Sequence, residues 1–345
     1  RAIADQLHLA LSDPDQAVVE AVPTRNTEAY QAYLRGLELL DSESFTRSSL
    51  ERAAEAFEEA VRLDPEFALA WARLSMVRSG LVQVDDDNDQ GAAALSALAE
   101  ARTLDPSLTE VDIAWAEYLY RGLAEYDQSL EVLEALEARQ SLSPDAIQLK
   151  AYLFRRLGRY RESYETMLEA ERLKPRSVGI KENIISLAVQ RDDCAAAGRH
   201  ARAALELAAD TSDTLTAVAD YELECNADGR RANELMKGVE LEAGWHFVIA
   251  WYAAIMAGDE ARALELSEWL AMVPAPTGSA IPRLQLAYFR RYQGREQEAV
   301  AILDDLAASL PEIEGQVPDE KFAAMALLDY YGLRGDRAAT RRWIE

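Results

Sequence analysis

Cysteine and histidine are scarce in this sequence, which has two cysteines and three histidines among 345 residues. Two cysteines are too few for a disulfide-rich scaffold. The histidines are His8, His200 and His246, and no HExxH motif or CxxC pair accompanies them, so neither a metal site nor a nucleophile–base triad is predicted. Glycine-rich phosphate loops of the GxGxxG and GxxxxGKS/T types are also absent. We therefore expect no catalytic residues, no bound metal and no cofactor.

Long apolar runs are lacking too. A membrane-spanning helix needs roughly 18 consecutive apolar residues, and the longest candidate, residues 247–257, is shorter and contains Trp251 and Tyr252. We expect this segment, together with Trp245, to belong to the protein core. No signal peptide is recognised. Because the chain begins with Arg1 inside a predicted helix, we interpret it as a segment of a longer protein.

Positive charge is in short supply. The chain has 36 Lys and Arg against 61 Asp and Glu, for a formal net charge of −25. Such a chain repels the phosphate backbone of nucleic acids and the surface of anionic membranes. Nucleic-acid binding by this segment is therefore not predicted, and the charge favours solubility and basic partners.

Strand patterns are almost absent, and the helix formers Ala, Leu, Glu and Arg dominate. Helical periodicity is plain in the stretch LERAAEAFEEAVRL, where apolar residues recur at intervals of three and four. That stripe consists of Leu50, Ala53, Ala54, Phe57, Ala60 and Val61. The sequence therefore predicts an all-α fold.

Proline and glycine divide the helices at regular intervals. Pro65, Pro106, Pro144 and Pro175 each follow a helical run, because proline cannot continue a helix. Between them lie glycines suited to the end of a helix, namely Gly158, Gly229, Gly258, Gly294 and Gly335. The predicted helix pairs are 26–41 with 47–63, 66–82 with 88–104, 108–122 with 126–141, 145–157 with 159–173, 177–190 with 193–208, 212–226 with 229–242, 244–257 with 259–272, 279–293 with 295–309, and 319–333 with 336–345.

This punctuated pattern resembles the tetratricopeptide repeat, a helical hairpin of about 34 residues with small and large residues at set places. The matching residues are Ala53, Phe57, Ala60, Leu63, Pro65, Trp71 and Leu74, and again Ala151, Phe154, Gly158, Tyr160, Ala170, Leu173 and Pro175. The resemblance implies a right-handed α-solenoid of about eight to nine helix pairs over residues 23–345. Residues 1–22 are interpreted as a terminal helix and linker left from a preceding domain.

A second resemblance is narrower. The stretch PTRNTEAYQAYLRGLELL, followed by such repeats, is similar to a junction in bacterial TolB-like and CadC-like membrane-anchored regulators and adenylate cyclases. It implies a non-catalytic module that binds a protein or peptide, with the regulator's own domains or a homodimer partner as candidates. It also implies a periplasmic location, with the cytoplasm as the alternative. A second hypothesis is a structural spacer or oligomerisation domain without a ligand.

In the family that this chain resembles, first helices of the pairs line a groove that holds ligands. The resemblance maps six side chains to groove-facing positions, namely Tyr152, Arg155, Arg156, Tyr288, Arg291 and Tyr292. Tyr and Arg are enriched at binding hot spots, and Arg could hold carboxylates of a partner. The alternative is an ordinary surface helix whose arginines lie over apolar neighbours.

Two further motifs leave alternatives open. Cys194 and Cys225 lie 31 residues apart, close to one repeat, so they should lie at neighbouring turns where either a disulfide or two free thiols is possible. A periplasmic location would favour the disulfide.

The acidic stretch from Val84 to Gly91 suggests a calcium site. Gln90 and Ser96, however, occupy positions where an EF-hand needs Gly and Glu, which favours a solvated loop.

Overall fold

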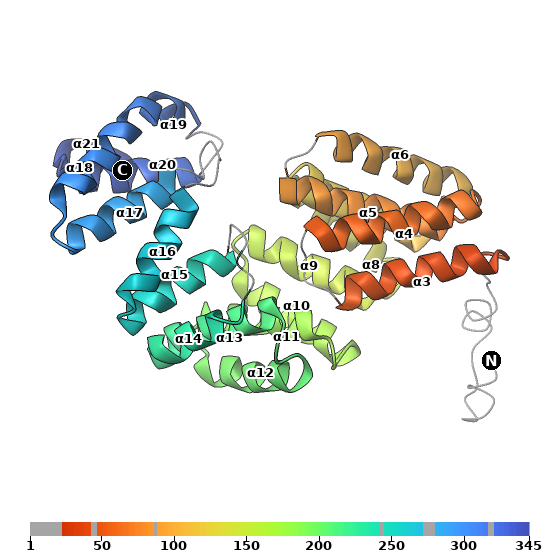
Figure 1. Cartoon of the computed structure of the whole chain (residues 1–345). Helices are drawn as coiled ribbons and strands as arrows, with labels where there is room; N and C mark the ends of the chain where they lie inside the picture. The colour runs from red at the N-terminus through yellow and green to blue at the C-terminus, as the bar shows by residue number, and fades with distance from the viewer. Residues whose placement is uncertain are drawn as a thin grey trace. The chain divides into compact units, whose positions relative to one another are not determined.

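A computed structural model of the chain describes residues 23–42, 47–85, 88–239, 241, 245–271, 280–316 and 321–344. Within these ranges every regular element is a helix and no strand occurs (Figure 1). The predicted all-α class is therefore confirmed. The chain divides into two compact units, Arg1–Ile180 and Lys181–Glu345. The terminal helix predicted within residues 1–22 lies outside the described residues, as do residues 86 and 87 of the acidic stretch.

The first unit consists of helices that pack consecutively in pairs. They are α3 (Thr27–Ser42), α4 (Arg47–Leu63), α5 (Ala68–Asp85), α6 (Asn88–Leu104), α7 (Thr109–Glu117), its π-helical continuation η1 (Tyr118–Gly122), α8 (Tyr126–Glu137), α9 (Pro144–Arg156) and α10 (Tyr160–Leu173). Packing also joins first helices of neighbouring pairs, since α5 contacts both α7 and η1.

The second unit continues the same arrangement. Its helices are α11 (Val178–Val189), which begins just before the boundary, α12 (Cys194–Leu207), α13 (Ser212–Asn226), α14 (Gly229–Met236), α15 (Trp245–Ala257), α16 (Glu260–Ala271), α17 (Ala280–Tyr292), α18 (Glu296–Leu306), the 3₁₀ turn η2 (Ala307–Ser309), α19 (Leu310–Gln316), α20 (Lys321–Arg334) and α21 (Arg337–Ile344). Here too first helices of successive pairs meet, since α13 contacts α15 and α17 contacts α20.

From the α7–α8 pair onward, the turn inside each pair contains a residue with left-handed backbone, which we call the αL residue. Glycine fills this position at Gly158, Gly258, Gly294 and Gly335, with φ between 71° and 75°. Ala124, Asp192 and Ala227 fill it elsewhere, with φ of 54°, 57° and 51°. The prediction that Gly229 ends a helix is therefore wrong. Ala227 makes that turn, and Gly229 is the first residue of α14.

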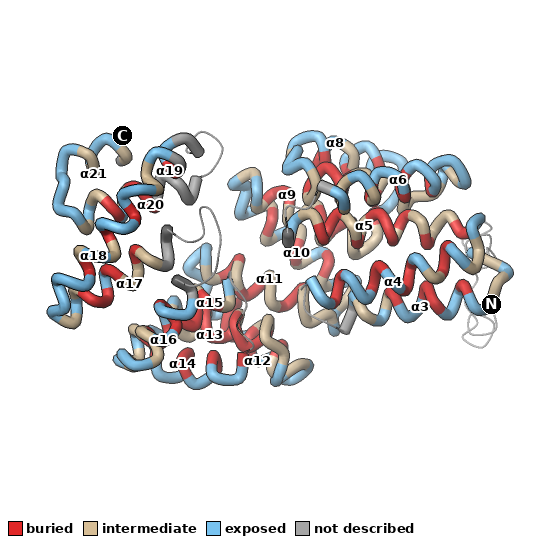
Figure 2. The backbone as a smooth tube through the Cα atoms, turned by 45° about the horizontal axis from the view of Figure 1, so that its top comes forward, coloured by how far each residue is buried: buried red, intermediate tan, exposed pale blue. Residues whose placement is uncertain are grey.

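Five residues after six of these seven αL residues, all except Gly335, a small side chain packs against the first helix of the pair. These side chains are fully or almost fully buried, and they are Ser129, Ser163, Ala197, Ala232, Ala263 and Ala299. A small residue allows two helices to approach closely, while large partners fill the space beside it. The buried residues recur along every pair (Figure 2).

The predicted packing of the first repeats is confirmed. Ala53, Phe57 and Ala60 have no exposed surface, and Trp71 packs against the same cluster while partly exposed. Gly36 lies directly under the Phe57 ring, where a Cβ would approach the ring atoms to 2.7 Å. The core of each unit is thus built from alternating small and large side chains.

Candidate binding site

The six predicted groove residues occupy equivalent positions in two helix pairs. Tyr152 and Tyr288 each lie six residues before their turn glycine, and Arg155 and Arg291 lie three residues before it. Arg156 and Tyr292 share the next position. The structure nevertheless gives the two sets different surroundings, so they are described separately.

Around α9, tyrosine and arginine side chains gather into one cluster. The Tyr152 ring stacks on Tyr120 of η1, with ring centroids 6.4 Å apart and planes 20° apart. The Arg155 guanidinium lies 5.3 Å from the Tyr152 ring centroid. Tyr126 adds a tilted ring 5.8 Å from Tyr120. Together with Arg121 and Arg156, these residues form what we call the tyrosine–arginine cluster.

Tyr120 is the centre of this cluster. It is 5% exposed, and the guanidiniums of Arg121 and Arg156 lie 5.2 and 6.0 Å from its ring centroid. Arg121 also forms a 2.5 Å ion pair with Glu117. Cation–π contacts of this kind gain strength where water is excluded. The ring therefore holds two cations side by side at the end of a helix.

The π-helix η1 places Tyr120 in this position. The hydroxyl of Ser163 donates to the Ala151 carbonyl at 2.7 Å across 12 residues of the α9–α10 pair. The hydroxyl of Ser129 donates to the Ala116 carbonyl at the same distance but across 13 residues. One extra residue is therefore accommodated in the first helix of the earlier pair. A π turn inserts a residue in this way and is frequent at functional sites.

Arg156 is the cation that this cluster leaves available. Its Nε donates to the Tyr120 hydroxyl at 3.4 Å, and its side chain lies on the exposed surface. Among the described residues, no carboxylate lies within ion-pair distance of it. Burial raises the pKa of the Tyr152 phenol, although Arg121 and Arg155 oppose the shift, so this ring stays neutral. Its hydroxyl accepts a 2.5 Å hydrogen bond from Gln148.

Tyr120 and Arg121 were not among the predicted site residues. A signal for them exists in the sequence, because YLYRGLAEY at 118–126 parallels YLFRRLGRY at 152–160. The parallel places Ala124 where the second stretch has Gly158, and both residues have positive φ. The extra π-helical residue, which sequence periodicity does not reveal, makes Tyr120 the stacking partner of Tyr152.

Around α17, the tyrosines are exposed but the arginine is occupied. Tyr288 and Tyr292 are 56% and 69% exposed. Arg291 donates two hydrogen bonds to the Glu296 carboxylate, at 2.9 and 2.6 Å, and one to the Leu333 carbonyl. This guanidinium therefore fixes the α17–α20 region and does not face outward as a free cation.

The aromatic residues of the apolar helix α15 are not all buried, contrary to the prediction from the sequence. Trp251 is buried and its indole donates to the Ser267 hydroxyl at 2.8 Å, as predicted for a core residue. Trp245 and Tyr252 are 57% and 52% exposed, so their assignment to the core is wrong. With no charged residue to mark an outer face, the helix gives no periodic signal that would separate its two sides.

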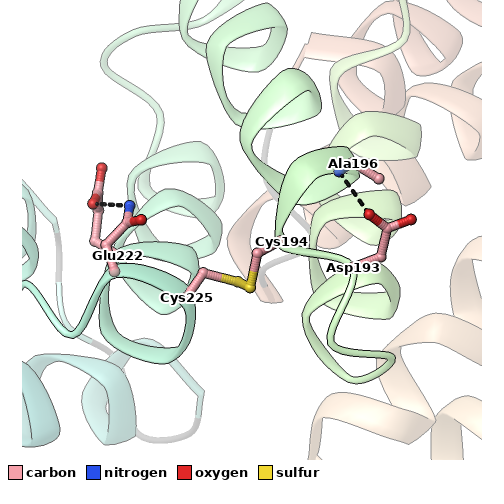
Figure 3. The surroundings of a disulfide bond; sticks show 6 residues. Asp193, Cys194, Ala196, Glu222 and Cys225 are labelled. Carbon is pink, nitrogen blue, oxygen red and sulfur yellow. Dashed lines mark hydrogen bonds between the residues drawn. A yellow bond between two sulfur atoms is a disulfide. The ribbon is translucent and has the colours of Figure 1, made fainter.

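Cys194 and Cys225 form a disulfide in the structure, with their Cα atoms 5.5 Å apart (Figure 3). Cys194 begins α12, where the Asp193 carboxylate caps the helix by accepting from the Ala196 amide at 3.0 Å. Cys225 lies in the last turn of α13. The bond therefore connects the second helix of one pair to the first helix of the next.

A polar chain links three successive first helices of the second unit. The Thr214 hydroxyl of α13 donates to Glu182 of α11 at 2.6 Å. Its neighbour Asp213 lies 2.8 Å from Nε2 of His246 on α15. Burial raises the pKa of Glu182 to about 7, and Asp213 adds to the shift while Thr214 and His246 oppose it. A nucleophile beside His246 is not seen among the described residues.

Neither a metal-binding cluster nor a membrane-spanning helix occurs within the described ranges. No three His, Cys, Asp or Glu side chains gather in a way that could hold a metal ion there. None of the helices there has the length and apolar character needed to cross a bilayer.

No protein-family model and no curated protein matches the chain. Among solved structures, yeast Tom70 is similar with a TM-score of 0.50 and 16% identity, over 93% of this chain and 68% of that one. A tetratricopeptide repeat protein from Parabacteroides merdae gives 0.42 and 13%, over 88% and 98%. YrrB, described as a TPR protein, gives 0.37 and 14%, over 62% and 99%. At these identities the likeness concerns the fold, and the chain has the helix-pair solenoid fold of tetratricopeptide repeat proteins.

Proposed function

We propose that the chain is a non-catalytic module that binds a protein or peptide, and that the tyrosine–arginine cluster holds an acidic segment of the partner. The observation that carries this proposal is Arg156. Its exposed guanidinium rests on Tyr120 and has no carboxylate partner among the described residues, although the chain has 61 acidic residues. A guanidinium that pairs with none of these described carboxylates is available to bind a carboxylate of a partner protein.

The surroundings of Arg156 favour binding. A guanidinium can hold a carboxylate through two parallel hydrogen bonds, and its attachment to a buried ring limits the rotamer entropy lost on binding. Arg155 and Tyr152 lie on the same helix as Arg156, and the Arg155 guanidinium rests on the Tyr152 ring. Tyr and Arg are the residue types that most often dominate binding energy.

The proposed setting is a bacterial membrane-anchored regulator with this module in the periplasm. The Cys194–Cys225 disulfide supports that location, because disulfides persist in oxidising compartments and are rare in the cytosol. The resemblance of residues 23–40 to the TolB-like and CadC-like junction supports the regulator assignment. A sensory role follows if the partner's binding is transmitted to the rest of the regulator.

Fluorescence anisotropy with a labelled peptide in which glutamate pairs alternate with leucine pairs tests the site. Arg156→Gln should weaken binding about tenfold, the usual effect of losing one charged hydrogen-bonded pair. Arg172→Gln is the control, because Arg172 is an exposed arginine of α10 outside the cluster. Equal binding by wild type, Arg156→Gln and the triple variant of Tyr152, Arg155 and Arg156 would refute the site.

A further inference from the structure

The second unit exposes an aromatic face on α15. Trp245, Tyr252 and Met256 are 57%, 52% and 54% exposed. Their spacings of seven and four residues place them on one side of the helix. Large apolar side chains that gather on one exposed face commonly mark an interaction site.

The next first helix extends this face. Tyr288 and Tyr292 of α17 precede Gly294 by the same intervals at which Tyr252 and Met256 precede Gly258. Phe289 of α17 belongs to the same buried cluster as the core residues of α15, so the two helices share one core. The exposed side chains therefore occupy repeated positions on successive first helices.

The preceding first helix contributes negative charge. Helix α13 contains four acidic residues and no Lys or Arg, and α15 contains no Asp, Glu, Lys or Arg. Asp213, Asp220 and Glu224 of α13 lie on one side of the helix, with the same seven- and four-residue spacing as the exposed residues of α15. Asp213 meets His246 at 2.8 Å, directly beside Trp245, so the acidic side adjoins the aromatic face.

Asp220 is a carboxyl group without a partner. It is 7% exposed, and in the part of the chain that the structure describes it has neither a hydrogen bond nor an ion pair. Burial raises its pKa to about 6, and Glu224 one turn away adds to the shift. A buried carboxylate is costly unless it is paired, and a cation supplied from outside would remove that cost.

We propose that this acidic–aromatic surface, made of Asp213, Asp220, Glu224, Trp245, Tyr252, Met256, Tyr288 and Tyr292, docks a segment of a partner protein that carries Lys or Arg beside apolar side chains. Charge complementarity selects this occupant. Carboxylates pair with ammonium and guanidinium groups, and exposed Trp and Tyr rings attract the same cations through their π faces. The apolar area of Trp245 and Met256 takes the partner's apolar side chains.

The arginines on the helix of Tyr288 and Tyr292 do not compete for these carboxylates. The arginines of α17 are engaged within the unit: Arg283 pairs with Asp305, Arg290 with Glu268, and Arg291 with Glu296. The surface is acidic, whereas the tyrosine–arginine cluster of the first unit is basic. The two sites are therefore independent of each other.

The test uses the whole chain and a labelled peptide in which lysine pairs alternate with leucine pairs. Tyr288→Ala with Tyr292→Ala should weaken binding about tenfold, as expected for two exposed aromatic anchors. Asp213→Asn with Glu224→Gln should weaken it several-fold and reduce its salt dependence. Circular dichroism verifies that the variants remain folded, which is expected because the tyrosines are exposed.

The matched control is Glu260→Gln with Glu265→Gln, which removes the same charge from exposed positions of α16. This control should bind as wild type does. Equal loss in the control, or full binding by the tyrosine variant, would mean that overall charge attracts the peptide and would overturn the proposal. It would also be overturned if sedimentation showed a homodimer that the tyrosine variant dissociates, because a second copy would then cover the surface. Binding of the glutamate–leucine peptide should be unchanged in all of these variants, which separates this test from that of the first unit.

Discussion

Gly229 at the start of α14 lies against the backbone of Met256 near the end of α15. A Cβ on Gly229 would lie 2.4 Å from the Met256 carbonyl carbon and 2.7 Å from its oxygen. Backbone atoms cannot yield as a flexible side chain can, so glycine is required here for close approach. The contact joins two successive helix pairs directly beneath the exposed end of α15.

Gly229→Ala should therefore destabilise the protein by about 2–3 kcal/mol, the usual cost of forcing a methyl group into a packed contact. Urea unfolding followed by circular dichroism measures the effect. Gly332→Ala is the control, because no atom lies within 4 Å of its added Cβ and alanine is the better helix former. An equal loss of stability in both variants would contradict the role given to the Met256 contact.

At Ala227, two residues before Gly229, a change to glycine should stabilise the protein. Its φ is 51°, a conformation that costs an L-residue with a Cβ roughly 1–2 kcal/mol. Ala227→Gly should relieve this strain and stabilise the protein by about 0.5–1 kcal/mol after the greater entropy of glycine in the unfolded chain is allowed for. The reciprocal change Gly258→Ala, at φ of 71°, should destabilise it by a similar amount. Thermal unfolding of both variants checks the pair, and the prediction is wrong if the two shifts have the same sign.

The Cys194–Cys225 disulfide closes a loop of 31 residues. Loop-closure entropy for that length predicts a stabilisation of about 3–4 kcal/mol. Reduction of the wild type should lower the free energy of unfolding by that amount, since the reduced unfolded chain gains freedom. Cys194→Ala with Cys225→Ala should match the reduced wild type and should not respond to reductant. Unfolding in urea with and without reductant makes the comparison, and unchanged wild-type stability would show that the bond adds nothing.

Much of the fold could be predicted because its signals are local. Helix pairs follow from apolar spacing and from turn residues, and the predicted boundaries of α9 and α12 differ from the observed ones by at most one residue. Ala227 was missed because the αL turn at that place has no glycine. The π-helix η1 was missed because one inserted residue leaves the apolar pattern intact.

The site residues were less predictable, because the exposure and pairing of a side chain depend on contacts from neighbouring helices. The sequence gives Arg155 and Arg291 the same position, yet Glu296 and the Leu333 carbonyl engage only the second. Trp245 and Trp251 lie on one apolar helix, and only packing against Ser267 distinguishes the buried one. Contacts between repeats determine such differences, and a single-sequence pattern does not contain them.

Glu182 should make stability depend on pH. Burial raises its pKa from 4.5 to about 7 in the folded protein, so the folded state holds this proton more tightly than the unfolded state. The stabilisation is fully present below about pH 4.5 and is lost as the pH rises to about 7. Because the side chain is only partly buried, we expect an effect on the order of 1–2 kcal/mol.

Glu182→Gln isolates this proton. The glutamine oxygen can still accept from Thr214, but the side chain cannot ionise, so the variant should be more stable than wild type at about pH 8 and equal to it near pH 4.5. A smaller slope should remain in the variant, because burial also raises the pKa of Asp220 to about 6. Glu206→Gln removes an exposed carboxylate of α12 and should leave the wild-type profile unchanged. Urea unfolding across this pH range measures all three proteins. Parallel profiles for wild type and Glu182→Gln would show that Glu182 does not carry the proton.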